Sequence, residues 1–318
     1  MQVADLSEAE LIAQFVGVLP PGETTMIGPG DDAALLSQPD TRVLVSTDVL
    51  VQDRHFRLDW GTAADVGYRA AMQNLADIAA MGGRATAIVV ALVLPSSTQV
   101  EWVVEFATGL AQACRPHRVG VVGGDLSSGD QLCVCVTVLG TLDSHAPVRR
   151  SGARPGDVVA HAGSLGWAAA GLAALRAGEG APWPRATAAF LRPEPPLAAG
   201  AAAAMGGAHA LIDVSDGLLT DAARIAQASG VSIDLDPAVL IDPDLEPIAQ
   251  ALDARVASWL LTGGEDHGLL AAFAPQTPLP PPFRRIGTVG RGPAGAVLVA
   301  GEPPPVPTTG WDHFRRTP

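Results

Sequence analysis

Short apolar segments followed at once by glycine or hydroxyl residues and a carboxylate recur four times along this chain. They lead into Ser46-Thr47-Asp48, Gly123-Gly124-Asp125, Asp213-Val214-Ser215-Asp216-Gly217 and Gly263-Gly264-Glu265-Asp266. A short apolar run bounded by turn residues is typical of a buried strand. Ligands bind at strand ends in layered α/β structures, where glycine lets the backbone approach them. The pattern therefore predicts layers of helices and sheets with polar side chains at the strand ends.

Three further acidic residues belong with these four motifs. Asp31 and Asp32 follow Gly30, and Asp77 lies in a helix-like segment where it is either solvated or a buried ligand. The small apolar residues around Asp77 favour burial. Carboxylates that gather at one place repel one another unless a cation lies between them, and hard oxygen ligands suit Mg²⁺. Each motif alone is more often a turn or a helix cap, but their number favours a metal-assisted site.

Charge limits the classes of partner. A net charge of -13 and a sequence pI near 4.8 argue against a nucleic acid held on a basic surface. The sequence contains neither a Walker-type phosphate loop nor the G-x-S-x-G elbow of many hydrolases. The lack of lysine and the many aspartates instead favour phosphates that are bound through Mg²⁺ bridges.

The length of 318 residues predicts two domains, because one small core cannot organise so long a chain. Between Pro147 and Gly156 the composition becomes basic and rich in turn residues, which is typical of a connector. We place the boundary there, with an N-terminal domain at residues 1-146 and a C-terminal domain at residues 147-318.

Strand-like and helix-like segments alternate along both halves, which indicates an α/β or α+β fold. The expected helices cover residues 7-17, 62-82, 97-115, 166-176, 186-191 and 217-229. The expected strands cover residues 43-45, 85-94, 119-122, 132-139 and 157-162.

The cysteines and the ends of the chain point to a cytoplasmic protein. Cys114, Cys133 and Cys135 do not form a disulfide framework and are interpreted as small buried hydrophobic residues. Acidic residues stand where a secretory leader would be basic, and no apolar segment is long enough or rich enough in leucine and isoleucine to span a bilayer. We therefore expect no membrane partner.

The motifs together occur in the order found in the thiamine-monophosphate kinase family, which this chain resembles over nearly its whole length. The matching segments are Gly30-Asp31-Asp32-Ala33-Ala34, Ser46-Thr47-Asp48, His55-Phe56, Asn74-Leu75-Ala76-Asp77-Ile78-Ala79-Ala80-Met81-Gly82, Gly123-Gly124-Asp125, Arg150-Ser151-Gly152, Asp213-Val214-Ser215-Asp216-Gly217, Gly263-Gly264-Glu265-Asp266 and Trp311-Asp312-His313-Phe314. The resemblance implies a two-domain α+β fold of the aminoimidazole-ribonucleotide-synthetase-like superfamily. In that fold the N-terminal α+β half binds ATP and metal and dimerises, and the C-terminal half is α/β.

The resemblance also implies an activity and a set of site residues. The activity is transfer of the γ-phosphoryl group of ATP to thiamine monophosphate, by a homodimer that uses several Mg²⁺ ions. The implied metal ligands are Asp32, Ser46, Thr47, Asp48, Asp77, Asp125, Asp213 and Asp216. The implied ATP contacts are Gly124, Asp125, Arg150 and Ser215, and the implied thiamine monophosphate contacts are His55, Glu265 and Trp311. The acceptor phosphate is already ionised, so no residue is assigned as a general base.

Some positions depart from the family pattern or allow another interpretation. Ala76 stands where the family has serine, His267-Gly268 where it has Tyr-Glu, and Gly28-Pro29-Gly30 where it has Gly-Ile-Gly. Taken alone, His55 could be a surface or capping histidine. Trp311 could equally hold the tail against the core.

Three alternative functions remain open. A selenophosphate-synthetase-like enzyme would need a reactive cysteine near the N-terminus, whereas the first cysteine here is Cys114. A hydrogenase-maturation relative would end in cysteine, whereas this sequence ends Arg316-Thr317-Pro318. A non-catalytic protein that binds divalent cations through its acidic clusters would bind metal without turning over ATP.

Overall fold

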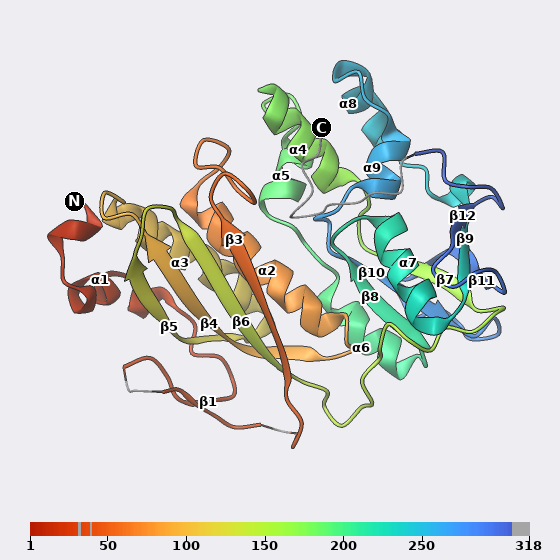
Figure 1. Ribbon diagram of the computed structural model, residues 1–318. Helices are drawn as coiled ribbons and strands as arrows, with labels where there is room; N and C mark the ends of the chain where they lie inside the picture. The colour runs from red at the N-terminus through yellow and green to blue at the C-terminus, as the bar shows by residue number, and fades with distance from the viewer. Residues whose placement is uncertain (31–32, 39, 307–318) are drawn as a thin grey trace. The chain divides into compact units, whose positions relative to one another are not determined.

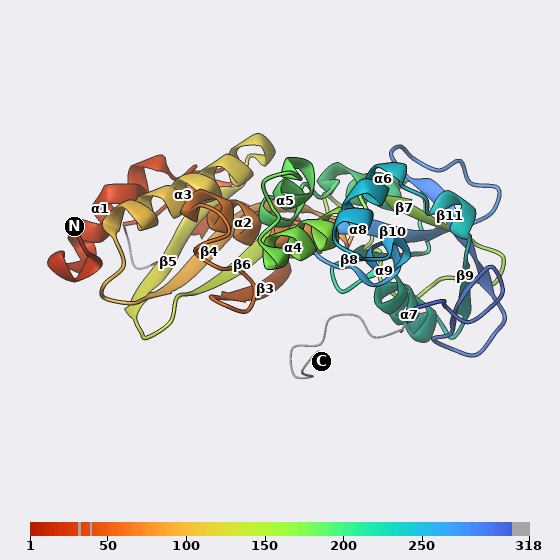
Figure 2. The same cartoon turned by 90° about the horizontal axis from the view of Figure 1, so that it is seen from above.

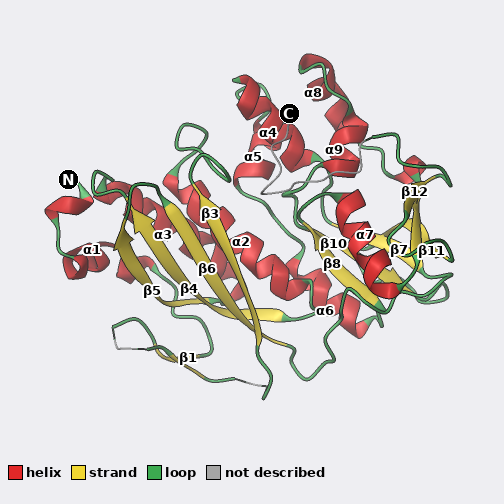
Figure 3. Cartoon of the chain, viewed as in Figure 1, coloured by secondary structure: helices red, strands yellow, loops and turns green. Residues whose placement is uncertain are grey.

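The computed structural model describes residues 1–30, 33–38 and 40–306 (Figure 1). They form two compact units. The N-terminal unit comprises Met1–Ile78 and Gly83–Ser144, and the C-terminal unit comprises Ala79–Gly82 and the chain from His145 onward. Each unit combines helices with a sheet (Figure 3), so the layered α+β content that the sequence predicts is confirmed.

A four-stranded sheet forms the centre of the N-terminal unit. Its strands lie in the order β3 (Leu44–Val51), β6 (Cys133–Thr141), β4 (Arg84–Leu94) and β5 (Gly120–Ser128). Strand β6 is antiparallel to both neighbours, whereas β4 and β5 are parallel. The strands β3 and β5 are therefore the two edges of this sheet. A separate two-stranded ribbon pairs β1 (Thr25–Ile27) with β2 (Leu35–Leu36).

Helices cover one face of this sheet (Figure 2). They are α1 (Glu8–Phe15), α2 (Ala63–Ala79) and α3 (Val100–Cys114). Helix α1 begins at Ser7, which forms a reciprocal capping box with Glu10, as the sequence predicts. Alternate residues of β6 on the covered face, Val134, Val136 and Val138, are fully buried. Because side chains alternate along a strand, the residues between them lie on the other face.

That other face is open and partly apolar. On β3, Val45 is 61% exposed and Val49 is 49% exposed. Thr137 and Cys135 on β6 are only half-buried. An exposed sheet face with several valine side chains is unusual for a surface that stays in water, and it marks a candidate interaction surface. We call this surface the open face.

A six-stranded sheet forms the centre of the C-terminal unit. The order is β12 (Val297–Val299), β9 (Ser232–Leu235), β11 (Arg284–Gly290), β7 (Val158–Ala162), β10 (Gly268–Phe273) and β8 (Ala210–Val214). All neighbouring strands are antiparallel except the parallel pair β12 and β9. Helices accompany this sheet: α4 (Trp167–Ala177), α5 (Pro184–Leu191), α6 (Leu197–Met205), α7 (Leu218–Ser229), α8 (Glu246–Ala251) and α9 (Val256–Thr262).

Both faces of the second sheet are packed. Leu270 and Ala272 of β10 belong to the core that contains residues of α4, α7 and α9, whereas Leu269, Ala271 and Phe273 pack with α6. The strand is buried on both faces and its sequence is apolar throughout, as expected for such a strand. Within the described ranges, no helix is both long and apolar enough to cross a bilayer.

The predicted ends of two strands are wrong, because pairing extends both strands, and one further segment is of the wrong type. Strand β3 continues through Ser46-Thr47-Asp48, and β5 continues through Gly123-Gly124-Asp125, because these residues pair with β6 and β4 respectively. Local turn composition had indicated strand ends there. The run Val256–Thr262, interpreted as a strand before the last motif, is helix α9. A short apolar run does not distinguish the two by itself.

Candidate functional site

Strand β3 and helix α2 are joined by two hydrogen bonds between polar side chains. Ser46 Oγ donates to Asp77 Oδ2 over 2.6 Å, and Gln73 Nε2 donates to Asp48 Oδ2 over 3.1 Å. Ser46 and Asp48 are two apart on a strand, and Gln73 and Asp77 are four apart on a helix, so each pair shares one face. We call these four side chains the β3–α2 seam.

The seam brings together three of the predicted ligands and leaves a fourth outside. Ser46, Asp48 and Asp77 belong to it, and all three are half-buried. Thr47 points to the open face, where its hydroxyl lies 3.0 Å from the Val136 carbonyl oxygen and 3.0 Å from Thr137 Oγ1. The alternation of side chains along β3 separates Thr47 from its two neighbours.

Asp125 and Gly124 lie on the opposite edge of the same sheet. Asp125 is exposed and accepts a hydrogen bond from Ser127 Oγ over 3.2 Å. Three strand spacings, or about 14 Å, separate β5 from β3. Gly124 is required for this register, because a Cβ there would lie 2.0 Å from the carbonyl oxygen of Val90. The sheet of one chain therefore keeps Asp48 and Asp125 apart.

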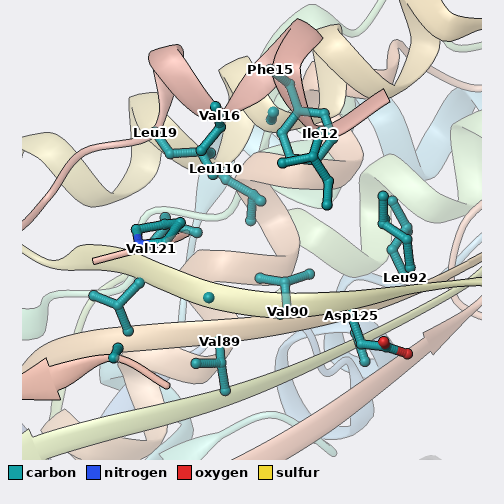
Figure 4. Close-up of a pocket in the computed structure, with 18 of the residues that line it drawn as sticks. Ile12, Phe15, Val16, Leu19, Val89, Val90, Leu92, Leu110, Val121 and Asp125 are labelled. Carbon is teal, nitrogen blue, oxygen red and sulfur yellow. The ribbon is translucent and has the colours of Figure 1, made fainter. Parts of the chain in front are cut away.

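An apolar cavity of about 760 Å³ adjoins strand β5 (Figure 4). Ile12 and Phe15 of α1, Phe106 and Leu110 of α3, and residues of β4 and β5 line it. Asp125 contributes a carboxylate to this lining (Figure 4). The cavity is of the size and character of a small-molecule site. The sequence analysis did not identify it, because its walls come from many elements that are far apart in the sequence.

Two of the motifs meet in the C-terminal unit. The backbone N–H of Glu265 donates to the Ser215 carbonyl oxygen over 2.9 Å, and that of His267 donates to the Val214 carbonyl oxygen over 3.2 Å. Gly264 permits this approach, since a Cβ there would lie 2.0 Å from the Ser215 oxygen. Glu265 and His267 have positive φ angles of 72° and 51°, which non-glycine residues adopt at a cost.

His267 lies between two of the predicted site carboxylates. Its Nδ1 is 3.5 Å from Asp213 Oδ2 and its Nε2 is 3.6 Å from Glu265 Oε2, separations of ion pairs rather than of good hydrogen bonds. Burial opposes a charged imidazole, but the two carboxylates raise the pKa of His267 well above its ordinary value. Burial likewise opposes the charge of Asp213, yet His267, Ser215 and Arg150 hold the pKa of Asp213 below its usual range. His267 is thus paired with a carboxylate on each side.

An arginine and a set of neutral donors hold three further carboxylates of this unit. Arg224 contacts Asp216 over 2.7 Å and the fully buried Asp221 over 2.5 Å. Burial raises the pKa of Asp221 to about 7, although Arg224 opposes that shift. Asp266 is buried at the N-terminus of α4 and accepts hydrogen bonds from Ser164 Oγ, Gly166 N and Ala168 N. Burial raises its pKa to about 6. Asp266 is therefore held by three hydrogen bonds at the start of α4.

His55 lies in the loop that follows β3. Its Nδ1 accepts a hydrogen bond from the Val51 backbone N–H over 2.9 Å. In the neutral ring the proton is therefore on Nε2, which makes this atom a donor. Asp53, two residues earlier, has a φ of 62° and turns the chain back toward β3. This geometry suits an anionic oxygen as the acceptor for Nε2.

The remaining predicted residues are placed as follows. Arg150 is exposed, and its charge acts on Asp213. Asp32 and Trp311 lie outside the described residues. No three acidic, histidine or cysteine side chains of the described chain lie close enough to hold a metal ion by themselves. Gln73 and Arg224, which the sequence analysis missed, contact predicted ligands. The spacing of four between Gln73 and Asp77 was a signal for the first of them.

Comparisons with known proteins cover most of the chain. The family model described as AIR synthase related protein, N-terminal domain, matches residues 30–142, and the model of the C-terminal domain matches residues 154–278. The thiamine-monophosphate kinase of Mycobacterium tuberculosis (strain CDC 1551 / Oshkosh) is 50% identical over 281 residues, which are 88% of this chain and 83% of that protein. The Corynebacterium glutamicum thiamine-monophosphate kinase is 39% identical and covers 90% of this chain and 88% of its own length.

Solved structures resemble the fold. Thiamine-monophosphate kinase from Stenotrophomonas maltophilia K279a has a TM-score of 0.78 and 30% identity, with 92% of this chain and 95% of that chain covered. AaThiL complexed with AMPPCP and TMP has a TM-score of 0.76 and 29% identity over 99% of both chains. The hydrogenase maturation protein HypE in complex with ATP has a TM-score of 0.72 but only 18% identity, which concerns the fold alone.

Proposed function

This chain belongs to the thiamine-monophosphate kinase family, and from that premise we propose that it transfers the γ-phosphoryl group of ATP to thiamine monophosphate. An oxygen of the substrate phosphate attacks the γ-phosphorus, and the bond from that phosphorus to the bridging oxygen breaks. Thiamine diphosphate and ADP are the products. The observation that carries the proposal is the 50% identity to the M. tuberculosis enzyme over 88% of this chain.

The chemical demand on the protein is positioning and charge neutralisation. The attacking phosphate oxygen is ionised at neutral pH, so no side chain has to remove a proton from it. Two polyanions must be brought in line, and this chain contains no lysine. Neutralisation therefore falls to arginine, to backbone N–H groups and to metal ions. The acidic composition of the chain is consistent with neutralisation of the phosphates by metal ions.

Asp48 and Asp77 fit a magnesium ion. Both offer hard carboxylate oxygens at the seam, and neutral donors hold one oxygen of each. Mg²⁺ in kinases is usually held by one or two carboxylates, with water and substrate phosphates completing its shell. When bound, it neutralises phosphate oxygens. The proposed ligands across both units are Asp32, Ser46, Thr47, Asp48, Asp77, Asp125, Asp213 and Asp216.

Gly124 and Asp125 would hold the nucleotide at the N-terminal unit. Both line the cavity beside β5, and an apolar cavity suits a planar purine. We therefore propose that the nucleoside part of ATP enters this cavity and that its phosphates lie near Asp125. In the C-terminal unit, Arg150 and Ser215 would contact phosphate oxygens.

His55 and Glu265 would contact thiamine monophosphate. The Nε2 proton of His55 is suited to a phosphate oxygen of the substrate. Glu265 carries a carboxylate at a strained backbone position, and a carboxylate is suited to the cationic thiazolium or to the aminopyrimidine. Trp311 would stack on one of the thiamine rings, a role that concerns residues outside the described part of the chain.

We also propose a homodimer that forms through the open face. Val45 and Val49 are exposed there beside Thr47, and a second copy would bury them. The N-terminal domain, residues 1-146, would then bind ATP and metal and dimerise, and residues 147-318 would form the C-terminal domain. A cytoplasmic location stays a prediction from the sequence.

Product formation tests the activity. Purified full-length protein is incubated with ATP, Mg²⁺ and thiamine monophosphate, and separate controls contain thiamine or no acceptor. We expect thiamine diphosphate in the first mixture alone. ATP consumption with some other acceptor, but not with thiamine monophosphate, would keep the fold family and overturn the substrate. Metal binding without any turnover of ATP would instead favour the non-catalytic alternative.

A further inference from the structure

Gln73 is a buried amide side chain that no role described so far uses. It lies on α2 and is only 7% exposed, and it donates from Nε2 to Asp48 Oδ2 over 3.1 Å. We propose that Gln73 is a positioning residue, which orients the Asp48 carboxylate for binding a divalent cation. The inference rests on the proposed function, because it assumes that Asp48 is a metal ligand.

The position of Gln73 in the helix limits the freedom of its amide. The neighbouring side chains Met72 and Asn74 are 3% and 1% exposed, so the helix is packed on both sides of Gln73. A buried amide that loses its acceptor loses a hydrogen bond that water cannot replace. The bond to Asp48 therefore restricts the rotation of the carboxylate as well as that of the amide.

The second hydrogen bond of the seam also runs from a neutral donor to a carboxylate, but from the strand to the helix. A strand hydroxyl, Ser46 Oγ, donates to a helix carboxylate, Asp77, and a helix amide donates to a strand carboxylate. Each carboxylate thus has its Oδ2 held by the facing element. Hydrogen bonds of this kind fix the direction in which a metal ligand points and are often as important as the ligand itself.

The chemistry of the donor supports a metal role over a purely structural one. An amide holds a carboxylate oxygen without cancelling its negative charge, whereas an arginine would compete with a cation for it. The same chain also contains a carboxylate that is held by an arginine, in the pair formed by Arg224 and Asp216. A neutral donor at position 73 keeps the attraction of Asp48 for a cation and fixes its direction.

Gln73→Met tests the inference, because methionine has nearly the same shape as glutamine but donates no hydrogen bond. Met72→Leu is the matched control, since it alters a buried neighbour on the same helix without touching the bond. Full-length proteins are compared by Mn²⁺ binding in electron paramagnetic resonance, with the metal alone, and by the Mg²⁺ concentration that gives half-maximal rate. Thermal unfolding and the KM for thiamine monophosphate are measured on the same samples.

We expect Gln73→Met to weaken Mn²⁺ binding and to raise the Mg²⁺ requirement by about ten-fold, the usual effect of losing a partner of a metal ligand. The KM for thiamine monophosphate should stay within about two-fold, because Gln73 is not among the proposed contacts of the acceptor. In an Asp48→Asn background, Gln73→Met should weaken Mn²⁺ binding no further, since the amide acts through that carboxylate.

Three results would overturn the inference. The first is unchanged Mn²⁺ affinity in folded Gln73→Met, and the second is an equal loss of affinity in the Asp48→Asn background. If Gln73→Met does not fold, Gln73→Asn, which keeps the amide at shorter reach, replaces it. Failure of both to fold while Met72→Leu folds would be the third, because the role of Gln73 would then be structural.

The outcome is separable from that of the proposed function. Suppose that the wild type makes no thiamine diphosphate but that Gln73→Met still binds Mn²⁺ more weakly than the wild type. That pair of results would support the positioning role of Gln73 and reject the kinase activity. Production of thiamine diphosphate by the wild type, with unchanged Mn²⁺ affinity in the variant, would do the reverse.

Discussion

The two units hold their site carboxylates in different ways. In the N-terminal unit the neutral groups of Ser46 and Gln73 donate to Asp77 and Asp48. In the C-terminal unit cationic side chains take that place, with Arg224 on Asp216 and an imidazolium on Asp213. The bonds of the first set thus come from neutral donors, whereas the contacts of the second set include charged groups.

This difference predicts how substitutions in each unit affect activity and stability. A carboxylate held by a neutral donor keeps its attraction for a metal ion, so its replacement should affect activity more than stability. A buried carboxylate paired with a cation depends on that partner, and removing the partner leaves a charge in a poorly solvated place. Substitution of the cations that hold the C-terminal carboxylates should therefore act mainly through stability.

The largest expected effect is that of Asp48→Asn. The change removes the charge but keeps the shape, and loss of a metal ligand of this kind should lower kcat by about 1,000-fold, or about 4 kcal/mol. Thermal unfolding should change little. Asp59→Asn, at an exposed ion pair with Arg57, is the control and should keep full activity. Near-normal turnover by Asp48→Asn would contradict the claim that Asp48 affects activity more than stability.

Arg224→Met should act in the opposite sense. It leaves Asp221, which is fully buried, and Asp216 without their cation, and we expect a loss of about 3 kcal/mol in the free energy of unfolding. Urea denaturation measures that loss. Arg118→Met removes an exposed partner of Glu23 and should cost far less. Equal losses in the two variants would contradict the distinction between the units.

Gly124→Ala tests the close backbone packing of β5 without changing the carboxylate of Asp125. The added Cβ would meet the Val90 carbonyl oxygen, so the edge strand must shift, and we expect a loss of about 2 kcal/mol in the free energy of unfolding. Gly123→Ala is the matched control, because its Cβ would meet only Val89 Cγ1 at an ordinary 3.8 Å. Comparable melting temperatures for the two variants would show that β5 moves freely.

The last expected effect concerns acid stability and develops only as the pH falls. His161 is fully buried, its ring nitrogens have no hydrogen-bond partner among the described residues, and burial, assisted by Arg284, lowers its pKa from 6.5 to about 3. Between these values the unfolded chain binds a proton that the native protein does not. The free energy of unfolding should therefore fall by about 1.4 kcal/mol for each unit of decreasing pH.

His161→Leu removes this proton uptake and should flatten the acid limb of the stability curve, measured by urea denaturation between pH 4 and pH 7 (roughly the range in which the two states differ). His145→Gln, at an exposed position, is the control. An unchanged slope in His161→Leu would mean that some other group sets the acid sensitivity of the C-terminal unit.

The sequence by itself determined the elements and the chemical character of the site. Capping residues, apolar periods and turn residues act over a few neighbouring positions, so the helices near Ser7 and Thr62 and the strand 85-94 were predictable. The order of the acidic motifs also indicated the family, which the comparisons confirmed. Where pairing partners decided the outcome, as at Gly123-Gly124-Asp125, local composition gave the wrong strand end.

Only the tertiary structure decided which predicted ligands meet. Strand alternation sends Thr47 to the open face and Ser46 and Asp48 to the helix, although the three are adjacent in sequence. The strand order places Asp125 on the far edge. The pairing of Gln73 with Asp48 likewise depends on how α2 lies against β3. These arrangements follow from contacts between residues far apart in the chain, about which a local sequence pattern carries no information.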